Sequence, residues 1–421
     1  MGHETPSIDS LMQAPVLAAS GAVRRGGAED AIDDVTPRLV VEPGTAEDLA
    51  GILAWASQER LAVVLRGGGT KMGWGRRPSP IDLMLSLRRL NRVVAHEYAD
   101  MTATIQAGAP LEAVDRELAR HGQCLAVDSA FEGTTVGGAI ATNDSGPRRH
   151  RYGTPRDLLI GIRLATADGR LVKAGGNVVK NVAGYDIGRL MCGSFGTLAA
   201  IVSATFKLVP LPRASSTVVA RFDRPEALVA AVTAVATSQL DPTSFDLHAG
   251  GSVYELLVRF TSAPAATDAQ IAQARTLIGP AAGTVLTGRE EAGCWRDQVR
   301  RVWDAPGVVV KAGWLPAALP DVLALLDDLQ RGGGSAELVG RAGLGSGLFR
   351  VEGEASVQLA AIARLRSESN LLRHVAVLRC PAGMKGAVDV WGPLGGAGTL
   401  GLAVKRVFDP AGILNAGRGP I

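Results

Sequence analysis

The sequence RGGGTKMGWG, residues 66–75, places three consecutive glycines directly after an apolar run that has the pattern of a strand. Glycine lacks the Cβ atom that blocks positive φ angles and close approach, so the backbone N–H groups of such a loop can converge on an anion. The run therefore predicts either a phosphate-binding loop or a plain β-turn between two strands. From this stretch alone both interpretations stay open.

Two common phosphate-binding designs do not fit this stretch. A P-loop needs G-x-x-x-x-G-K-[ST] at the start of a helix, whereas Lys71 here follows Thr70 and precedes Met72. A dinucleotide-binding G-x-G-x-x-G needs its third glycine at position 72 and a helix that begins there. The chain continues instead as WGRRPSP, residues 74–80, which disfavours a helix. The remaining phosphate-binding design is a loop of backbone amides that works without a helix dipole.

The segments around the glycine run alternate between strand and helix patterns. One helix is predicted to begin after Thr45, with Asp48 in the position of a capping box, and another extends from Pro110 to Gly122. Apolar and polar residues alternate between positions 201 and 208, which predicts a half-buried strand. Strands are predicted, in chain order, at residues 38–41, 62–65, 81–85, 102–106, 159–165 and 201–208.

The pattern changes after LVPLPR, residues 208–213, whose two prolines predict a crossing between domains. Two successive strand–helix–strand–helix sets then extend over residues 217–380. Alternation at this spacing is typical of an antiparallel α+β domain of ferredoxin-like character, in which helices cover one face of the sheet.

Composition and charge exclude several classes of protein. The 421 residues are 47% hydrophobic and 20% charged, which suits a globular protein of more than one domain. A formal net charge of +3 predicts no dense basic face, so we do not expect nucleic acid as a partner. No run is long and apolar enough to predict an integral membrane segment. The cysteines form no C-x-x-C pair, which argues against an iron–sulfur or zinc ligand set and favours a reducing, cytoplasmic setting; they are Cys124, Cys192, Cys294 and Cys380.

Two further glycine-rich segments make a set of plain turns a poor explanation. Residues 128–146, DSAFEGTTVGGAIATNDSG, combine small residues, hydroxyls and an amide in a stretch that is too apolar for a linker. Such a stretch is expected to form a wall against a flat ligand. Residues 175–203, GGNVVKNVAGYDIGRLMCGSFGTLAAIVS, contain six glycines around a central KNVAGYD.

Together these segments resemble the FAD-binding domain of the vanillyl-alcohol oxidase and p-cresol methylhydroxylase (PCMH) superfamily. Within it, the sequence is most similar to the FAD-binding subunits of bacterial glycolate oxidases, which are related to D-2-hydroxy-acid dehydrogenases. The resemblance covers residues 37–212 and a closing VFDPAGILNAGRG at residues 407–419. KNVAGYDIGRLMCGSFGTL, residues 180–198, is its most specific part, and SGPRRHRYGTPRDLLIGIRL, residues 145–164, is similar to the subunit-specific pattern.

The resemblance implies an α+β protein with a PCMH-type two-part FAD-binding domain and a ferredoxin-like α+β cap domain. Four parts are expected. They are a flexible N-terminal extension (residues 1–30), the FAD-binding PCMH-type domain (31–212), the cap domain (213–395) and a C-terminal return to the FAD domain (396–421).

The resemblance further implies an FAD-dependent oxidoreductase acting on CH–OH groups, as the FAD-binding subunit of a glycolate (2-hydroxy-acid) oxidase or dehydrogenase complex. The implied partners are an iron–sulfur subunit, a second flavin subunit and a small 2-hydroxy-acid substrate. The implied location is cytoplasmic, with partners able to hold the chain at the inner face of the membrane. The alternative is a subunit that mainly assembles the complex, with FAD non-catalytic or absent.

The resemblance also assigns cofactor-binding residues. The backbone that would hold the FAD pyrophosphate belongs to Arg66, Gly67, Gly68, Gly69 and Thr70. The residues that would line the ribityl chain and the isoalloxazine are Asp128, Ser129, Thr134, Gly137, Gly138, Thr142 and Asn143. Ile201 is implied beside the adenosine half, and Asn415 is implied to return to the flavin from the tail. Thr70 stands where some relatives carry a histidine bonded to the flavin, so a non-covalent FAD is expected.

The sequence assigns no catalytic residue and no metal site. Dehydrogenases of this group bind a divalent ion through paired histidines and a glutamate–histidine pair in the cap, whereas His248 and His374 here lack such partners. Oxidation of a 2-hydroxy acid needs a base and a cation for the carboxylate. Residues of suitable type, each with a surface or packing role as the competing interpretation, are Arg148, Arg149, Tyr152, Lys180 and Tyr185.

Overall fold

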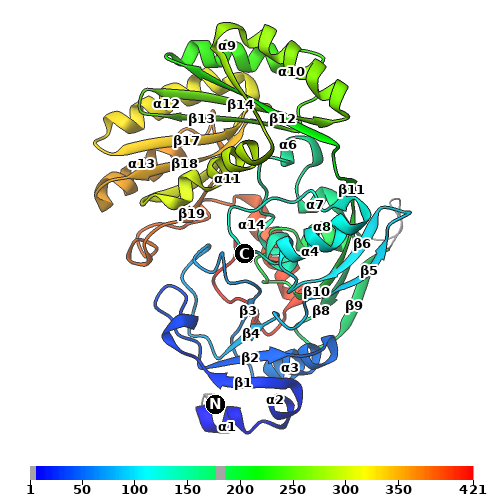
Figure 1. Cartoon of the computed structure of the whole chain (residues 1–421). Coiled ribbons are helices and arrows are strands. Elements are labelled where there is room, and N and C mark those ends of the chain that lie inside the picture. Colours follow the sequence, from blue (N-terminus) through cyan, green and yellow to red (C-terminus); the bar gives the residue numbers. More distant parts are fainter. Residues whose placement is uncertain (1–5, 177–184, 421) are drawn as a thin grey trace.

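Two sheets of different topology build the N-terminal domain of the computed structural model, which describes residues 6–176 and 185–420 (Figure 1). The first sheet has the order β1-β2-β4-β3, formed by β1 (Gly21–Arg25), β2 (Leu39–Pro43), β4 (Leu83–Ser86) and β3 (Val63–Arg66). Both β2 and β3 pair with β4 in parallel, so the carboxyl ends of these strands meet at one edge. Because β3 runs directly into the glycine run, the loop leaves the sheet at this edge.

The helix between β2 and β3 shows why the sequence folds this way locally. In α3 (Ala46–Gln58), the Thr45 hydroxyl accepts the Asp48 amide and the Asp48 carboxylate accepts the Thr45 amide, both at 3.0 Å. This reciprocal capping box satisfies amides that a helix start leaves free. The apolar face of α3 lies in the core, as the helical spacing of its leucines and isoleucine predicts.

The second sheet is antiparallel throughout, in the order β5-β6-β10-β8-β9. Its strands are β5 (Val93–Glu97), β6 (Thr102–Gln106), β10 (Ala200–Lys207), β8 (Leu159–Ala165) and β9 (Leu171–Gly175). A two-stranded ribbon joins β7 (Gln123–Cys124) to β11 (Val209–Pro210). The remaining helical segments of this domain are η1 (Ala28–Asp30), α4 (Leu111–Leu118), η2 (Ala119–His121), α5 (Val136–Thr142), α6 (Arg149–Tyr152), α7 (Pro155–Leu158) and α8 (Ile187–Met191).

The predicted half-buried character of the strand at residues 201–208 is wrong. Ser203 and Thr205 are buried like their apolar neighbours, because β10 is the central strand of its sheet and both of its faces are covered. The Thr205 hydroxyl lies 2.9 Å from the hydroxyl of Thr104 on β6, so the two polar groups satisfy each other inside the domain.

The prediction that residues 1–30 form a flexible extension is also wrong for the residues described here. α1 (Ile8–Met12) and α2 (Pro15–Ser20) bury Leu11 and Leu17 in the core of the N-terminal domain, and β1 pairs antiparallel with β2. The prediction followed the small and polar residues that dominate this stretch, but its two leucines bury apolar surface against the domain core. The other predicted domain boundaries remain predictions.

The cap is a single antiparallel sheet with the order β15-β12-β14-β13-β17-β18-β16-β19. Its strands are β12 (Ala214–Phe222), β13 (Ser244–Gly250), β14 (Val253–Ser262), β15 (Ala282–Thr287), β16 (Val308–Gly313), β17 (Ser335–Arg341), β18 (Ser346–Glu352) and β19 (Arg373–Arg379). Its helices are α9 (Pro225–Ala236), α10 (Pro264–Ile278), η3 (Gly279–Ala281), α11 (Gly288–Asp304), η4 (Pro316–Ala318), α12 (Leu319–Arg331), α13 (Ala355–Ser367) and η5 (Ala382–Met384). The predicted α+β class is confirmed.

The expectation that helices cover only one face of the cap sheet needs correction. The core that contains α9, α10, α12 and α13 also contains Val308 and Val310, whereas Val302 of α11 packs against Val309 on the opposite face. Successive residues of a strand point to opposite faces, so α11 covers the other side of the sheet. In Figure 1, α11 lies on the side that faces the N-terminal domain.

The C-terminal segment returns to the N-terminal domain after α14 (Gly396–Phe408). The Val63 amide donates to the Ile413 carbonyl and the Asn415 amide donates to the Val63 carbonyl, both at 2.8 Å. The tail therefore extends alongside β3, the strand that leads into the glycine loop, and Figure 1 shows it in red within the lower lobe.

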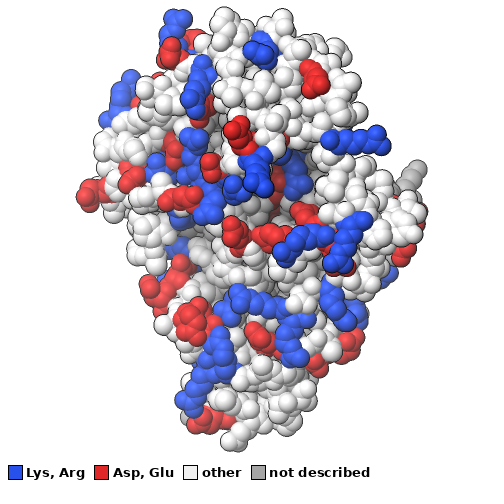
Figure 2. All heavy atoms as spheres, in the orientation of Figure 1, with Lys and Arg blue, Asp and Glu red and all other residues white. Residues whose placement is uncertain are grey.

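Acidic and basic side chains are mixed over the surface that Figure 2 displays, and neither sign forms a continuous field there. Among the described residues, no helix has the length and apolar composition required to cross a bilayer.

We expect Leu17→Ala to lower the free energy of unfolding of the N-terminal domain by about 2–5 kcal/mol, because the side chain is fully buried against α3 and its removal leaves a cavity. The unfolding transition in urea measures this change. Val94→Ala is the control, because 59% of Val94 is exposed and its loss should have little effect. Equal stability of the two variants would support the prediction that residues 1–30 form a flexible extension.

Candidate functional site

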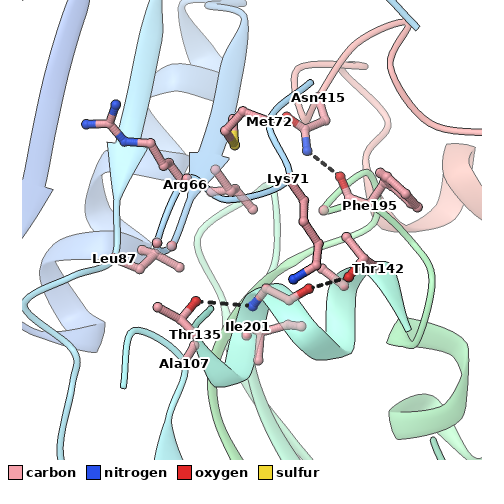
Figure 3. A pocket seen from close by; sticks show the side chains of 18 of the residues that line it. Arg66, Lys71, Met72, Leu87, Ala107, Thr135, Thr142, Phe195, Ile201 and Asn415 are labelled. Atoms are coloured by element: carbon pink, nitrogen blue, oxygen red, sulfur yellow. Dashed lines mark hydrogen bonds between the residues drawn. The ribbon is translucent and has the colours of Figure 1, made fainter. Parts of the chain in front are cut away.

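The glycine loop forms one wall of a pocket between the two sheets of the N-terminal domain (Figure 3). The empty space within it, counted out to its mouth and including open solvent there, is about 750 Å³. The lining residues are Leu65, Arg66, Gly67, Gly68, Gly69, Thr70, Lys71, Met72, Leu87, Ala107, Thr135, Gly137, Gly138, Ala141, Thr142, Phe195, Gly196, Ala199, Ile201, Asn415 and Arg418. We call this space the glycine-loop pocket.

The backbone amides of residues 67–71 are free to serve a ligand. No described residue accepts a hydrogen bond from them, whereas the carbonyl of Arg66 accepts the Leu87 amide at 2.8 Å and continues the β3–β4 ladder. The Arg66 side chain points away from the loop in Figure 3, and its guanidinium bonds the Asp30 carboxylate at 2.8 Å. The pocket therefore presents the loop's main chain rather than this cation.

The first turn of α5 also lines the pocket, which the sequence interpretation without a helix did not foresee. Its amides are already occupied within the protein. The amide of Val136 donates to Ala109 at 2.9 Å, that of Gly137 donates to Ala107 at 2.8 Å, and that of Gly138 donates to the Thr135 hydroxyl at 3.4 Å. The amides at the start of α5 are therefore not available to a ligand, unlike those of the glycine loop.

Two of the glycines are required for different reasons. A Cβ atom on Gly68 would lie 1.9 Å from the Gly133 carbonyl oxygen, so only glycine allows the loop to pack this closely on the segment before α5. Gly69 has a φ angle of +81°, which side chains with a Cβ rarely adopt. The loop is thus held in a turned conformation by backbone contact.

Comparison with known proteins identifies this arrangement. Residues 37–175 match the family described as FAD binding domain, and this range contains β3, the glycine loop and the start of the second sheet. This part of the chain is an FAD-binding domain. FAD is its cofactor, as the resemblance implied.

Several curated relatives share the N-terminal half of this flavoprotein. It is 35% identical over 229 residues to D-2-hydroxyglutarate dehydrogenase of Xanthomonas citri pv. viticola, covering 54% of this chain and 48% of the relative. It is 32% identical to glycolate oxidase subunit GlcD of Bacillus subtilis, covering 50% and 45%, and 34% identical to glycolate oxidase subunit GlcE of Escherichia coli K12, covering 44% and 52%. The matches span about half the length of these relatives.

Solved structures extend the similarity of fold to nearly the whole flavoprotein. Alkyldihydroxyacetonephosphate synthase superposes with a TM-score of 0.72 at 17% identity, over 98% of this chain and 86% of that one. The Bermuda grass pollen isoallergen BG60 superposes with a TM-score of 0.67 at 16% identity, over 92% of each chain. At these identities the comparison shows the fold alone.

The pocket fits FAD in two observable respects. The free loop amides suit a diphosphate, whose oxygens only accept hydrogen bonds. Asn415 donates its side-chain amide to the Phe195 carbonyl, as Figure 3 shows, while its own side-chain oxygen is buried without a partner among the described residues. A buried acceptor of this kind is costly unless a ligand donates to it, and FAD carries such donors.

The structure brings most of the predicted cofactor residues to the pocket wall. Those on the wall are Arg66, Gly67, Gly68, Gly69, Thr70, Gly137, Gly138, Thr142, Ile201 and Asn415. Ser129 and Thr134 lie behind the wall and bond Lys71, and Asn143 caps α5 one residue beyond Thr142. Their roles toward FAD remain predictions.

The assignment of Asp128 to the cofactor is not supported, because its carboxylate is taken by Arg148. The Arg148 backbone amide donates to it at 2.7 Å and the guanidinium donates a second, short hydrogen bond. Burial alone would lower the pKa of Arg148, but the carboxylates of Asp128 and Asp115 outweigh burial and raise it. Arg148 is thereby removed from the substrate-binding candidates as well.

Of the other candidate residues, Tyr185 is 93% exposed and Tyr152 packs partly buried against the domain core. Lys180 lies outside the described residues. Arg149 lines a different space, the cavity between the two domains.

Lys71 is a pocket residue that the sequence analysis missed. Its ammonium group lies 3.0 Å from the Asp144 carboxylate, 3.0 Å from the Thr134 hydroxyl and 3.2 Å from the Ser129 hydroxyl. The ion pair joins the buried Lys71 to the partly buried Asp144 and links the glycine loop to the segment after α5. The signal available in the sequence was the position of this lysine directly after G-G-G-T. Because this spacing does not match a P-loop, it did not indicate a role for Lys71.

A second cavity lies between the two domains, with an empty volume of about 1420 Å³ out to its mouth. It shares Thr142 and Phe195 with the glycine-loop pocket, so the two spaces adjoin. Trp74, just after the glycine loop, stacks on Trp303 of α11 with ring centroids 5.5 Å apart. We call this space the interdomain cavity.

The two cap histidines differ, because His248 is buried beside carboxylates and His374 is exposed. The Nε2 atom of His248 lies 3.1 Å from Glu337, and Glu255 is close to its other ring nitrogen. Burial opposes protonation of His248, but hydrogen bonds to these carboxylates outweigh it and raise its pKa. His374 is exposed at the edge of the interdomain cavity. Within residues 6–176 and 185–420, no cluster of three His, Cys, Asp or Glu side chains has a metal-binding arrangement.

We expect Gly68→Ala to abolish retention of FAD, because its new methyl group would displace the Gly133 carbonyl and deform the loop. The visible absorbance of the flavin after desalting measures retention. Gly73→Ala is a matched control in the same loop, since its Cβ would meet nothing within 4 Å. A full complement of FAD in Gly68→Ala would contradict the assignment of the loop to the pyrophosphate.

Proposed function

We propose that this chain is the FAD-binding subunit of a 2-hydroxy-acid oxidase or dehydrogenase complex, and glycolate oxidase is one of the activities named among its relatives. The observation that carries this proposal is the contact between the two cavities. Because Thr142 and Phe195 belong to both walls, a small substrate in the interdomain cavity would lie next to a cofactor in the glycine-loop pocket.

The composition of the pocket wall supports a non-covalent FAD. Thr70 stands at the position where some relatives carry a flavin-linked histidine, and no histidine, cysteine or tyrosine occurs among the described lining residues. Covalent attachment of a flavin needs a nucleophilic side chain. We assign the pyrophosphate to the loop amides of residues 66–70 and the flavin contact of the tail to Asn415.

Bound FAD would supply the oxidising centre for a C–H bond next to a hydroxyl group. The chain itself must then accept the hydroxyl proton. Asp144 is the only carboxylate among the described residues that line the interdomain cavity. Lys71 and the Ser129 hydroxyl fix its Oδ2 atom at 3.0 and 2.9 Å, which orients the group. We assign Asp144 as the proton acceptor.

The assembly proposal rests on similarity to two different subunits named for glycolate oxidase. We propose that electrons leave this chain through a separate iron–sulfur subunit and that a second flavin subunit completes the complex. The alternative is a chain that mainly assembles the complex without catalytic FAD. The free loop amides and the unpartnered Asn415 oxygen favour cofactor binding over that alternative.

We expect the purified full chain, supplied with FAD and mixed anaerobically with glycolate or D-lactate, to lose its visible flavin absorbance. The same measurement with the companion subunits and an electron acceptor tests whether turnover depends on the complex. A protein that stays colourless in the presence of excess FAD would favour the assembly role. A yellow protein that is bleached neither by these two acids nor by a 2-hydroxydicarboxylate, alone or in the complex, would contradict the 2-hydroxy-acid oxidase proposal.

We expect Asp144→Asn to lower kcat by roughly 10²–10⁴-fold, the usual contribution of a general base. Because this change leaves Lys71 without its counter-ion, the double variant Lys71→Met/Asp144→Asn is needed beside it. If Asp144 only neutralised Lys71, the double variant would regain activity. If Asp144 accepts the proton, the double variant stays inactive while it retains FAD.

A further inference from the structure

The interdomain cavity contains two cations that the described part of the protein does not neutralise. Arg149 comes from α6 of the FAD-binding domain and Lys311 from β16 of the cap, and both line the cavity. Neither side chain makes a hydrogen bond or an ion pair with any residue in the ranges 6–176 and 185–420. All the other charged groups of this wall except one exposed histidine are paired, which makes these two exceptional.

The remaining charges of the cavity cancel among themselves. Arg341 of β17 is paired with the buried carboxylate of Asp246. Burial raises the pKa of Asp246 to about 6, whereas the charge of Arg341 and its hydrogen bond to the carboxylate favour the ionised form of Asp246. Asp144 is balanced by Lys71 at 3.0 Å. His374 is exposed at the edge of β19.

Burial and neighbouring positive charges disfavour the protonated forms of both cations. Burial lowers the pKa of Lys311, and the charges of Arg149 and Arg341 lower it further against the opposing effect of Asp144. Burial and the charge of Arg341 likewise lower the pKa of Arg149. Unpaired charges in a partly enclosed space are unfavourable for folding, so a ligand that neutralises both would bind with a large electrostatic advantage.

Arg149 and Lys311 lie in a cavity that adjoins the proposed cofactor pocket. Arg149 and Lys311 approach from different domains, and the cavity between them reaches Thr142 and Phe195 of the glycine-loop pocket. The rest of the wall includes the large aromatic side chain of Trp303. A ligand held between the two domains would therefore lie within the same space as the proposed proton acceptor.

We propose that the interdomain cavity binds a small dianion, a 2-hydroxydicarboxylate, whose two carboxylates are held by Lys311 and Arg149. This inference rests on the proposed function and narrows its substrate class, because a monocarboxylate such as glycolate leaves one cation unbalanced. Guanidinium and ammonium groups are the usual partners of buried carboxylates.

The direct test is binding of succinate and of butyrate to the FAD-loaded full chain by titration calorimetry. These probes have the same number of carbon atoms and neither has a hydroxyl group to oxidise, so they isolate the effect of the second carboxylate. Succinate is expected to bind at least about tenfold more tightly, since a hydrogen-bonded charge pair contributes on the order of 1.5–3 kcal/mol. Equal affinity for the two probes would overturn the proposal.

Single substitutions assign the binding to the two residues. Lys311→Met and Arg149→Met are each expected to weaken succinate binding by about 10- to 100-fold and to leave butyrate less affected. The matched controls are Lys173→Met and Arg275→Met, which remove exposed cations outside both cavities. Unchanged succinate affinity in either cavity variant would remove that residue from the site.

The dependence on pH separates ligand contact from a structural role. Because the pKa of Lys311 lies below that of an ordinary lysine, succinate affinity of the wild type is expected to fall as the pH rises through that lowered pKa. Lys311→Arg should keep its charge and its affinity over the same range, since arginine stays protonated. A parallel loss of affinity in the wild type and in Lys311→Arg would contradict a contact through the Lys311 ammonium group.

Failure of this inference is distinguishable from failure of the proposed function. Dianion binding with the expected variant pattern, but without bleaching of the flavin by 2-hydroxydicarboxylates, would keep the anion site and reject the redox role. Bleaching by glycolate together with equal binding of succinate and butyrate would keep the redox role and reject the dianion.

Discussion

The contact on which the rest of the structure depends is the approach of the glycine loop to the backbone before α5. At Gly68 a Cβ atom would lie 1.9 Å from the Gly133 carbonyl oxygen, so the two chain segments touch main chain to main chain. Through this contact the loop after β3 of the first sheet packs on the segment before α5, which lies on the side of the second sheet. The glycine-loop pocket is the space left between these two sheets, and its donors are the amides that the contact leaves unbonded.

An ion pair extends that arrangement toward the cap. Lys71 follows the glycine loop, and its pairing with Asp144 fixes the segment that borders the interdomain cavity. The stacking of Trp74 on Trp303 adds an apolar contact between the same loop region and α11. The loop that would hold the cofactor and the surface that would hold the substrate are therefore positioned by one short stretch of chain, which explains why the two cavities adjoin.

Local patterns predicted much of the fold because they depend on neighbours in the sequence. Examples are the capping box of Thr45 and Asp48, the strand at residues 102–106 and the antiparallel cap sheet. Each follows from the spacing of residue types along the chain. The failures occur where burial depends on distant partners. Alternation of polar and apolar residues along β10 predicted one solvent-exposed face, yet elements from elsewhere in the chain cover both faces. The N-terminal leucines likewise pack on the distant helix α3.

The sequence by itself determined the glycine loop, the strands that carry it, the likeness to FAD-binding subunits and the absence of a histidine at position 70. These are properties of residue type and spacing, which the chain keeps wherever it folds. Only the tertiary structure decided which polar groups are available, because neutralisation depends on distance in space. It removed Asp128 and Arg148 by pairing them, brought Lys71 to Asp144, and left Arg149 and Lys311 facing one cavity from two domains.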